Sequence, residues 1–147
     1  EVAELIERMA LASSTVFYVD TLEFLRRGGR IGRANALLGS ALAIKPILAL
    51  DEGQIVPLEK VRTASKAIAR LEEIAVDAAL KAGAGVEIAV QHVDSEERAR
   101  LLAERLTARV ATRTGRVDIV ELGAVVGAHV GPGTLAVAVV PSRESRP

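Results

Sequence analysis

The chain has 147 residues, of which 50% are hydrophobic and 26% charged, a composition typical of one folded domain with its own core. It has no cysteine, which excludes disulfides, cysteine-ligated metal centres and thiol nucleophiles. Nineteen basic residues balance 19 acidic ones, and only 2% of residues are aromatic. Neither a basic field nor a base-stacking platform is present, so the composition argues against a nucleic-acid partner.

The first third of the chain predicts helices on both sides of a strand. Apolar residues recur at helical spacing over residues 1–11, and residues 15–19 are β-branched and aromatic, as in a strand. Asp20 and Thr21 can cap a helix that runs through residues 22–27 and ends at Gly28. An alanine- and leucine-rich stretch predicts a further short helix over residues 34–42.

The middle of the chain predicts a hairpin followed by alternating helices and strands. Two strands, residues 44–50 and 54–58, flank a turn at 51–53, and their prolines favour edge or end positions. Helices are expected over residues 63–82 and between Ser95 and Gly115, with strands over 86–93 and 117–122. This order predicts an α/β fold with a mixed β-sheet and flanking helices.

Residues 122–142 carry no formal charge and are long enough to span a bilayer, but their glycines and two prolines would break a spanning helix. We interpret them as parts of two buried strands, the second over residues 134–140, joined by a glycine-rich turn. Residues 142–147 are expected to form a polar tail. The chain begins without Met and without the basic start of a signal peptide, so we expect a fragment or a processed product.

Four arginines and three glycines lie close together in residues 26–33. Arg26 and Arg27 stand at a predicted helix C-terminus, where the dipole favours cations, and this is their preferred interpretation. Arg30 lies between Gly29 and Ile31, which favours an inward orientation. A guanidinium there can bind a carboxylate or phosphate through two hydrogen bonds. For Arg30 an anion-binding role and a solvated position remain equally open.

The segment Gly-Ala-His-Val-Gly-Pro-Gly-Thr, residues 127–134, matches neither a Walker loop nor a dinucleotide fingerprint. It is expected to hold His129 in a tight turn. The imidazole can donate to an anionic oxygen, or backbone carbonyls of the turn can satisfy it, and the residues alone slightly favour the second. His92, at a strand end, is interpreted as structural or exposed. Two isolated histidines give no metal-ligand spacing.

Arg62 lies where the hairpin meets the long helix, in the sequence Lys-Val-Arg-Thr at residues 60–63. A cation near a helix N-terminus opposes the dipole, which hints at a ligand or partner, although a solvated junction is the preferred account. No Ser–His–Asp arrangement and no close carboxylate pair indicates a catalytic residue. From the residues alone, the chain is interpreted as an anion-binding α/β module.

Several of these segments occur together, in order, in one known family. Residues 20–31 (DTLEFLRRGGRI), 44–48 (IKPIL), 60–63 (KVRT) and 127–134 (GAHVGPGT) resemble the signature of the DegV family of bacterial fatty-acid-binding proteins. The resemblance implies that residues 1–141 form the C-terminal lipid-carrier domain of a two-domain protein. One fatty acid lies between the domains in that family, and the N-terminal domain, which supplies Thr and Ser hydroxyls to the carboxylate, is missing from this chain.

The resemblance also implies roles for individual residues. His129 would donate to the carboxylate of a long-chain fatty acid, Arg30 would support that network, and Arg62 would lie near the face that meets a partner kinase. Gly131 and Thr134 are implied loop contacts. Four further apolar residues are candidates to line the acyl chain, although core packing is the preferred role for them: Leu37, Leu38, Leu42 and Ile47.

The implied function is that of a cytoplasmic carrier, not an enzyme. It takes a fatty acid from the membrane surface and presents it to a fatty acid kinase, which forms the acyl phosphate for phospholipid synthesis. Neither a cofactor nor a metal is implied. Two alternatives stay open: a phosphoryl-transfer enzyme in which Arg30, Arg62 and His129 stabilise the phosphoryl group, and a structural or dimerising domain. Arg30 and His129 on opposite sides of the sheet would favour the latter.

Overall fold

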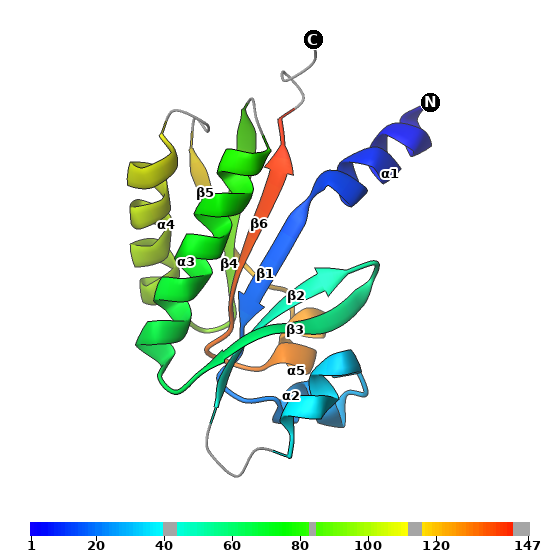
Figure 1. The fold of residues 1–147 in the computed structure, drawn as a ribbon, viewed down its shortest axis with the longest axis vertical. Helices are drawn as coiled ribbons and strands as arrows, with labels where there is room; N and C mark the ends of the chain where they lie inside the picture. The colour runs from blue at the N-terminus through cyan, green and yellow to red at the C-terminus, as the bar shows by residue number, and fades with distance from the viewer. Residues whose placement is uncertain (40–43, 83–84, 112–115, 143–147) are drawn as a thin grey trace.

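The computed structural model describes residues 1–39, 44–82, 85–111 and 116–142. Within these residues six strands form one sheet in the order β3-β2-β1-β6-β4-β5 (Figure 1). Every neighbouring pair is antiparallel except β4 and β5, so the predicted mixed sheet is confirmed. The strands are β1 Ser14–Tyr18, β2 Lys45–Asp51, β3 Gln54–Val61, β4 Val86–His92, β5 Val117–Glu121 and β6 Leu135–Pro141.

The helices divide between the two faces of the sheet (Figure 1). They are α1 Val2–Ala12, α2 Glu23–Arg27, the 3-10 helix η1 Gly32–Leu37, α3 Ala64–Lys81, α4 Glu96–Val110 and α5 Ala124–Val130. The long helices α3 and α4 cover one face, and α2, η1 and α5 lie together at one end of the other face. Helix α1 projects beyond β1 and has no buried residue.

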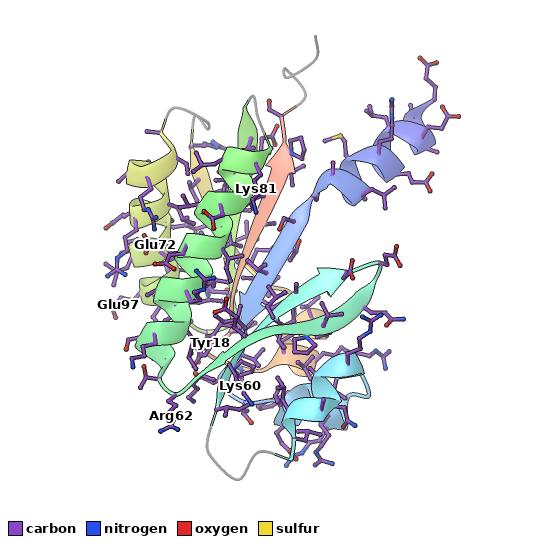
Figure 2. The ribbon with its side chains drawn as sticks, viewed as in Figure 1. Tyr18, Lys60, Arg62, Glu72, Lys81 and Glu97 are labelled. Carbon is purple, nitrogen blue, oxygen red and sulfur yellow. The ribbon has the colours of Figure 1, made fainter. Side chains whose placement is uncertain are left out.

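Alternation along the strands divides the core in two. On β1, Val16 and Tyr18 face α3 and α4, whereas Phe17, and Val19 directly after the strand, face α2, η1 and α5. The larger core includes Leu71 of α3 and, from α4, Leu102 and Leu106. Beside it, the carboxylate of Glu72 on α3 is nearly buried and accepts a hydrogen bond from Arg109 of α4 at 2.9 Å (Figure 2). This ion pair joins the two long helices.

The predicted hairpin, the two long helices and the strand over residues 86–93 are confirmed with small shifts at their ends. Helix α3 begins after Thr63, whose hydroxyl accepts a hydrogen bond from the Lys66 N–H at 3.3 Å. Among the described residues, no helix is both long enough and apolar enough to cross a membrane.

Two predictions near the site are wrong. The helix expected over residues 34–42 is the 3-10 helix Gly32–Leu37, and residues 40–42 of that prediction lie outside the described residues. The strand expected over residues 134–140 is confirmed as β6, but the glycine-rich turn expected before it is wrong: a helix, α5, follows β5, and β5 itself is mostly exposed. His129 therefore lies in the last turn of a helix. Gly131, at φ 83°, ends this helix and donates its N–H to Gly127 O at 2.8 Å.

Candidate functional site

A cavity of about 220 Å³ lies on the sheet face that α3 and α4 leave open. Its walls are apolar and come from the sheet, α2 and α5, and they include Phe17, Leu25, Leu122, Val126, Val130 and Ala136. The predicted site residues Arg30, His129 and Thr134 also line it. The structure thus brings a guanidinium, an imidazole and a hydroxyl, from segments far apart in the sequence, to one apolar cavity on one side of the sheet.

His129 carries an unsatisfied polar atom. Its Nδ1 is buried and has no hydrogen-bond partner among the residues that the structure describes. The alternative in which backbone carbonyls satisfy this histidine therefore does not hold for Nδ1. Buried polar atoms are usually paired, because burying one without a partner costs about 1–3 kcal/mol. Such an exception at a cavity wall indicates a site for a ligand.

Arg30 is held beside the same loop. Its N–H donates to Leu25 O at 2.9 Å, and its Nη1 donates to Gly28 O at 2.8 Å. No carboxylate in the described ranges forms an ion pair with Arg30. Since a guanidinium has five N–H donors, most of its donors remain available for an anion. This geometry is compatible with the anion-binding interpretation of Arg30.

Arg26 and Arg27 are engaged within α2. Both donate to the Glu23 carboxylate, Arg26 through Nε at 2.9 Å and Arg27 through Nε at 2.9 Å. The hydrogen bond from Arg26, followed by its charge and the contacts from Arg27, lowers the pKa of Glu23 to about 2. These two arginines therefore support their own short helix, in line with the preferred interpretation.

The glycine-rich turn after α5 packs tightly against α2. Gly131 and Gly133 both have positive φ, and a Cβ on either would overlap a side chain: Phe24 for Gly131 and Asp20 for Gly133. The buried Thr134 hydroxyl donates to Gly131 O at 2.8 Å. Gly131 is thus a packing residue and does not line the cavity, whereas Thr134 does.

The other residues singled out from the sequence lie away from the cavity. Ile47 is fully buried in the core under α3, Leu37 packs against the smaller core and Leu38 is exposed. Core packing, the preferred role, is thus confirmed for Ile47 and Leu37; none of the three lines this cavity, and Leu42 lies outside the described residues. His92 is buried and accepts a hydrogen bond from Ser95 N–H at 3.3 Å, which fits its structural interpretation.

Arg62 is exposed between β3 and α3, outside the cavity. Figure 2 shows it with Lys60 near the start of α3, at the lower end of the molecule in this view. The structure therefore separates Arg62 from Arg30 and His129. The enzyme alternative requires all three residues to hold one phosphoryl group together. In this structure Arg62 lies outside the cavity that the other two line.

Most of the cavity wall was not predicted. The sequence places Phe17 and Leu122 in expected strands and Val126 in the expected turn, and it gives none of the three a role in a cavity. A usable signal exists in the sequence: Leu122, Val126, His129 and Val130 recur at helical spacing, which places the histidine on the same face as three apolar side chains.

A larger polar hollow, of about 930 Å³, lies at the carboxyl ends of β4 and β5. Its charged residues partly pair with one another: Arg98 lies 4.0 Å from Asp20 and Arg100 lies 2.9 Å from Glu96. The described residues contain no cluster that could hold a metal ion. The only buried side-chain atom left without a partner in the described part belongs to His129, which lines the apolar cavity, and this makes that cavity the stronger candidate.

Comparison with known proteins assigns the chain to a family. The model of uncharacterised proteins of the DegV family matches residues 1–142. The chain belongs to the DegV family. It is 61% identical over 135 residues to a DegV domain-containing protein of Streptomyces coelicolor, covering 90% of this chain and 46% of that protein. It is 40% identical over 134 residues to protein DegV of Bacillus subtilis, again covering 90% and 46%.

Solved DegV structures share the fold. A fatty acid binding DegV family protein from Streptococcus agalactiae matches with a TM-score of 0.84 and 32% identity, over 97% of this chain and 49% of that one. DegV of Bacillus subtilis, described as a fatty acid binding protein, matches with a TM-score of 0.80 and 37% identity, over 96% and 49%. The chain thus spans about half the length of the DegV proteins that it matches.

Proposed function

We propose that this chain is a lipid-carrier domain that binds the carboxylate of a long-chain fatty acid at His129 and Arg30. The observation that carries the proposal is the apolar cavity that His129 and Arg30 line together, with no hydrogen-bond partner for His129 Nδ1 and no carboxylate paired with Arg30 among the described residues. Apolar walls with two nitrogen donors suit an amphiphile that has an alkyl chain and an anionic head. Relatives of known structure that are described as fatty acid binding support the same ligand class.

We further propose that a second domain completes the site. The cavity, about 220 Å³, is smaller than the roughly 300–1,000 Å³ of most small-molecule sites. Its rim exposes large apolar side chains, with Val125 77% and Leu50 51% exposed. These features, and the match to about half of each relative, support residues 1–141 as the C-terminal domain of a two-domain protein in which the fatty acid lies between the domains.

Delivery of the fatty acid to a kinase is a further part of the proposal. In it, a cytoplasmic carrier takes the lipid from the membrane surface and presents its carboxylate, and the kinase forms the acyl phosphate for phospholipid synthesis. The chain itself supplies no catalytic step. Arg62 is the proposed kinase-facing residue, since it is exposed beside Lys60 and lies outside the cavity.

The kinase role of Arg62 is tested separately from binding. In the full-length protein, Arg62→Ala should leave the bound lipid unchanged and lower the rate of phosphorylation by the kinase about tenfold or more, as expected for the loss of a charged interface contact. Lys66→Ala, at an exposed residue further along α3, is the control. Equal phosphorylation of both variants and the wild type would remove Arg62 from the interface.

Lipid binding is tested by organic extraction of the purified full-length protein and mass spectrometry of the extract. The wild type should release a fatty acid, and His129→Ala should retain much less, because a hydrogen bond to a charged group is lost. Ala128→Ser, at the exposed neighbour on α5, should retain as much as the wild type. Product formation from a phosphorylated substrate without a kinase would instead favour the enzyme alternative.

A further inference from the structure

Gly28 has no conformational reason to be a glycine. It ends α2 with φ −76° and ψ −6°, a right-handed helical conformation open to any residue. Its neighbour Gly29 is the opposite case, with φ +68° and nothing within 4 Å of where a Cβ would lie. A different constraint must therefore explain glycine at position 28.

That constraint is the imidazole of His129. A Cβ on Gly28 would overlap Nδ1 of His129, and would lie 3.1 Å from its Cε1 and 3.2 Å from the backbone oxygen of Phe24. The peptide around Gly28 is fixed on both sides, because its N–H donates to Phe24 O at 2.9 Å and its O accepts from Arg30 Nη1 at 2.8 Å. The ring of His129 thus lies against a rigid stretch of backbone that only a residue without a side chain can provide.

This contact also decides which ring nitrogen carries the proton. Nδ1 is buried against Gly28 with no acceptor in the described part of the chain, so a proton there would be an unpaired buried donor. Nε2 also has no partner among the described residues, but unlike Nδ1 it is not buried. It therefore keeps accessible surface, at a residue that lines the cavity.

We propose that Gly28 is a positioning residue that orients the ring of His129 so that Nε2, and not Nδ1, is the hydrogen-bond donor available to the cavity. The inference rests on the proposed function only for the identity of the group that accepts this hydrogen bond. An imidazole held in this way is a donor only at Nε2. The site therefore favours a head group that accepts hydrogen bonds, such as an ionised carboxylate, over one that only donates them, such as an alkylammonium.

The test compares Gly28→Ala with Gly127→Ala in the full-length protein labelled with 15N-histidine. Gly127 is the matched control, because it lies on the same helix as His129 and its added Cβ would make only ordinary contacts, 3.6 Å from Val93. The imidazole 15N shifts of His129 should show protonation at Nε2 in the wild type and in Gly127→Ala. Gly28→Ala should lose this pattern and bind palmitic acid about ten- to a hundredfold more weakly.

A double-mutant cycle, measured by thermal unfolding, tests the proposal even if Gly28→Ala folds poorly. If the imidazole is what the new methyl group meets, Gly28→Ala should lower the Tm by about 3 °C or more in the wild type and by much less in His129→Ala. An equal Tm loss in both backgrounds overturns the proposal, as does an unchanged 15N pattern in Gly28→Ala. A wild type that binds no palmitic acid overturns the proposed function, while the spectra and the cycle still decide the role of Gly28.

Discussion

At the scale of single residues, the sequence revealed the polar groups of the site better than its walls. The residues alone left an anion-binding role open for Arg30 and slightly disfavoured one for His129; the family resemblance implied both roles, and both residues line one cavity. Core packing was the preferred role for Ile47, which packs under α3, but the side of the sheet that a strand residue faces depends on register. The sequence shows which residues are apolar but not which side of the sheet each of them faces.

Tyr18 gives a prediction at this scale. It is the chain's one tyrosine, its side chain is fully buried, and its hydroxyl donates to the Asp20 carboxylate. Burial, with the hydrogen bond and charge of Asp20, raises the pKa of Tyr18 above its usual value of 10. The unfolded chain loses this proton near pH 10 and the folded chain does not. The contribution of Tyr18 to the free energy of unfolding is therefore constant below that pH and falls above it.

The measurement is an alkaline titration of tyrosinate absorbance, with circular dichroism to follow folding. The difference between the wild type and Tyr18→Phe isolates this residue. No Tyr18 tyrosinate should form at about pH 11 while the protein stays folded. Ionisation near pH 10 in the folded protein would contradict the buried Tyr18–Asp20 arrangement.

At the scale of elements, the regular parts of the fold were predictable and α5 was not. The hairpin, α3, α4 and β4 follow from strong periodicity and clear ends. Residues 124–130 contain three valines and a glycine, which are poor helix formers, so local preference favoured a turn between two strands. Packing of Val130 in the smaller core and of the following turn against α2 determines the helix instead, and such long-range contacts cannot be seen in local sequence.

Two glycines of this segment should respond in opposite ways to alanine. Gly127 lies inside α5 with room for a Cβ, so Gly127→Ala should stabilise the protein by about 0.5–1 kcal/mol. Gly131 has φ +83° and lies against the Phe24 ring, so Gly131→Ala should destabilise it by about 2 kcal/mol or more. Denaturant unfolding measures both changes. A stable Gly131→Ala variant would contradict the close packing of the turn on α2.

At the scale of the whole molecule, the mixed sheet was predicted and its unequal covering was not. Helices α3 and α4 cover one face of the sheet (Figure 1). The other face carries an apolar cavity with an exposed rim. Helix α1 adds exposed apolar residues of its own, with Val2 72% and Leu11 75% exposed. Exposed apolar surface of this kind marks a face that binds a partner or a ligand, which agrees with a site completed by a second domain.

The most direct test of this account is the amount of fatty acid that copurifies with the full-length protein, measured by mass spectrometry of the extracted lipid. The account predicts close to one fatty acid per wild-type molecule, a much lower ratio for His129→Ala, and the wild-type ratio for Ala128→Ser. Equal occupancy in His129→Ala and the wild type would contradict the assignment of the head group to His129. Absence of fatty acid from the wild type, with no uptake of added palmitic acid, would contradict the carrier function itself.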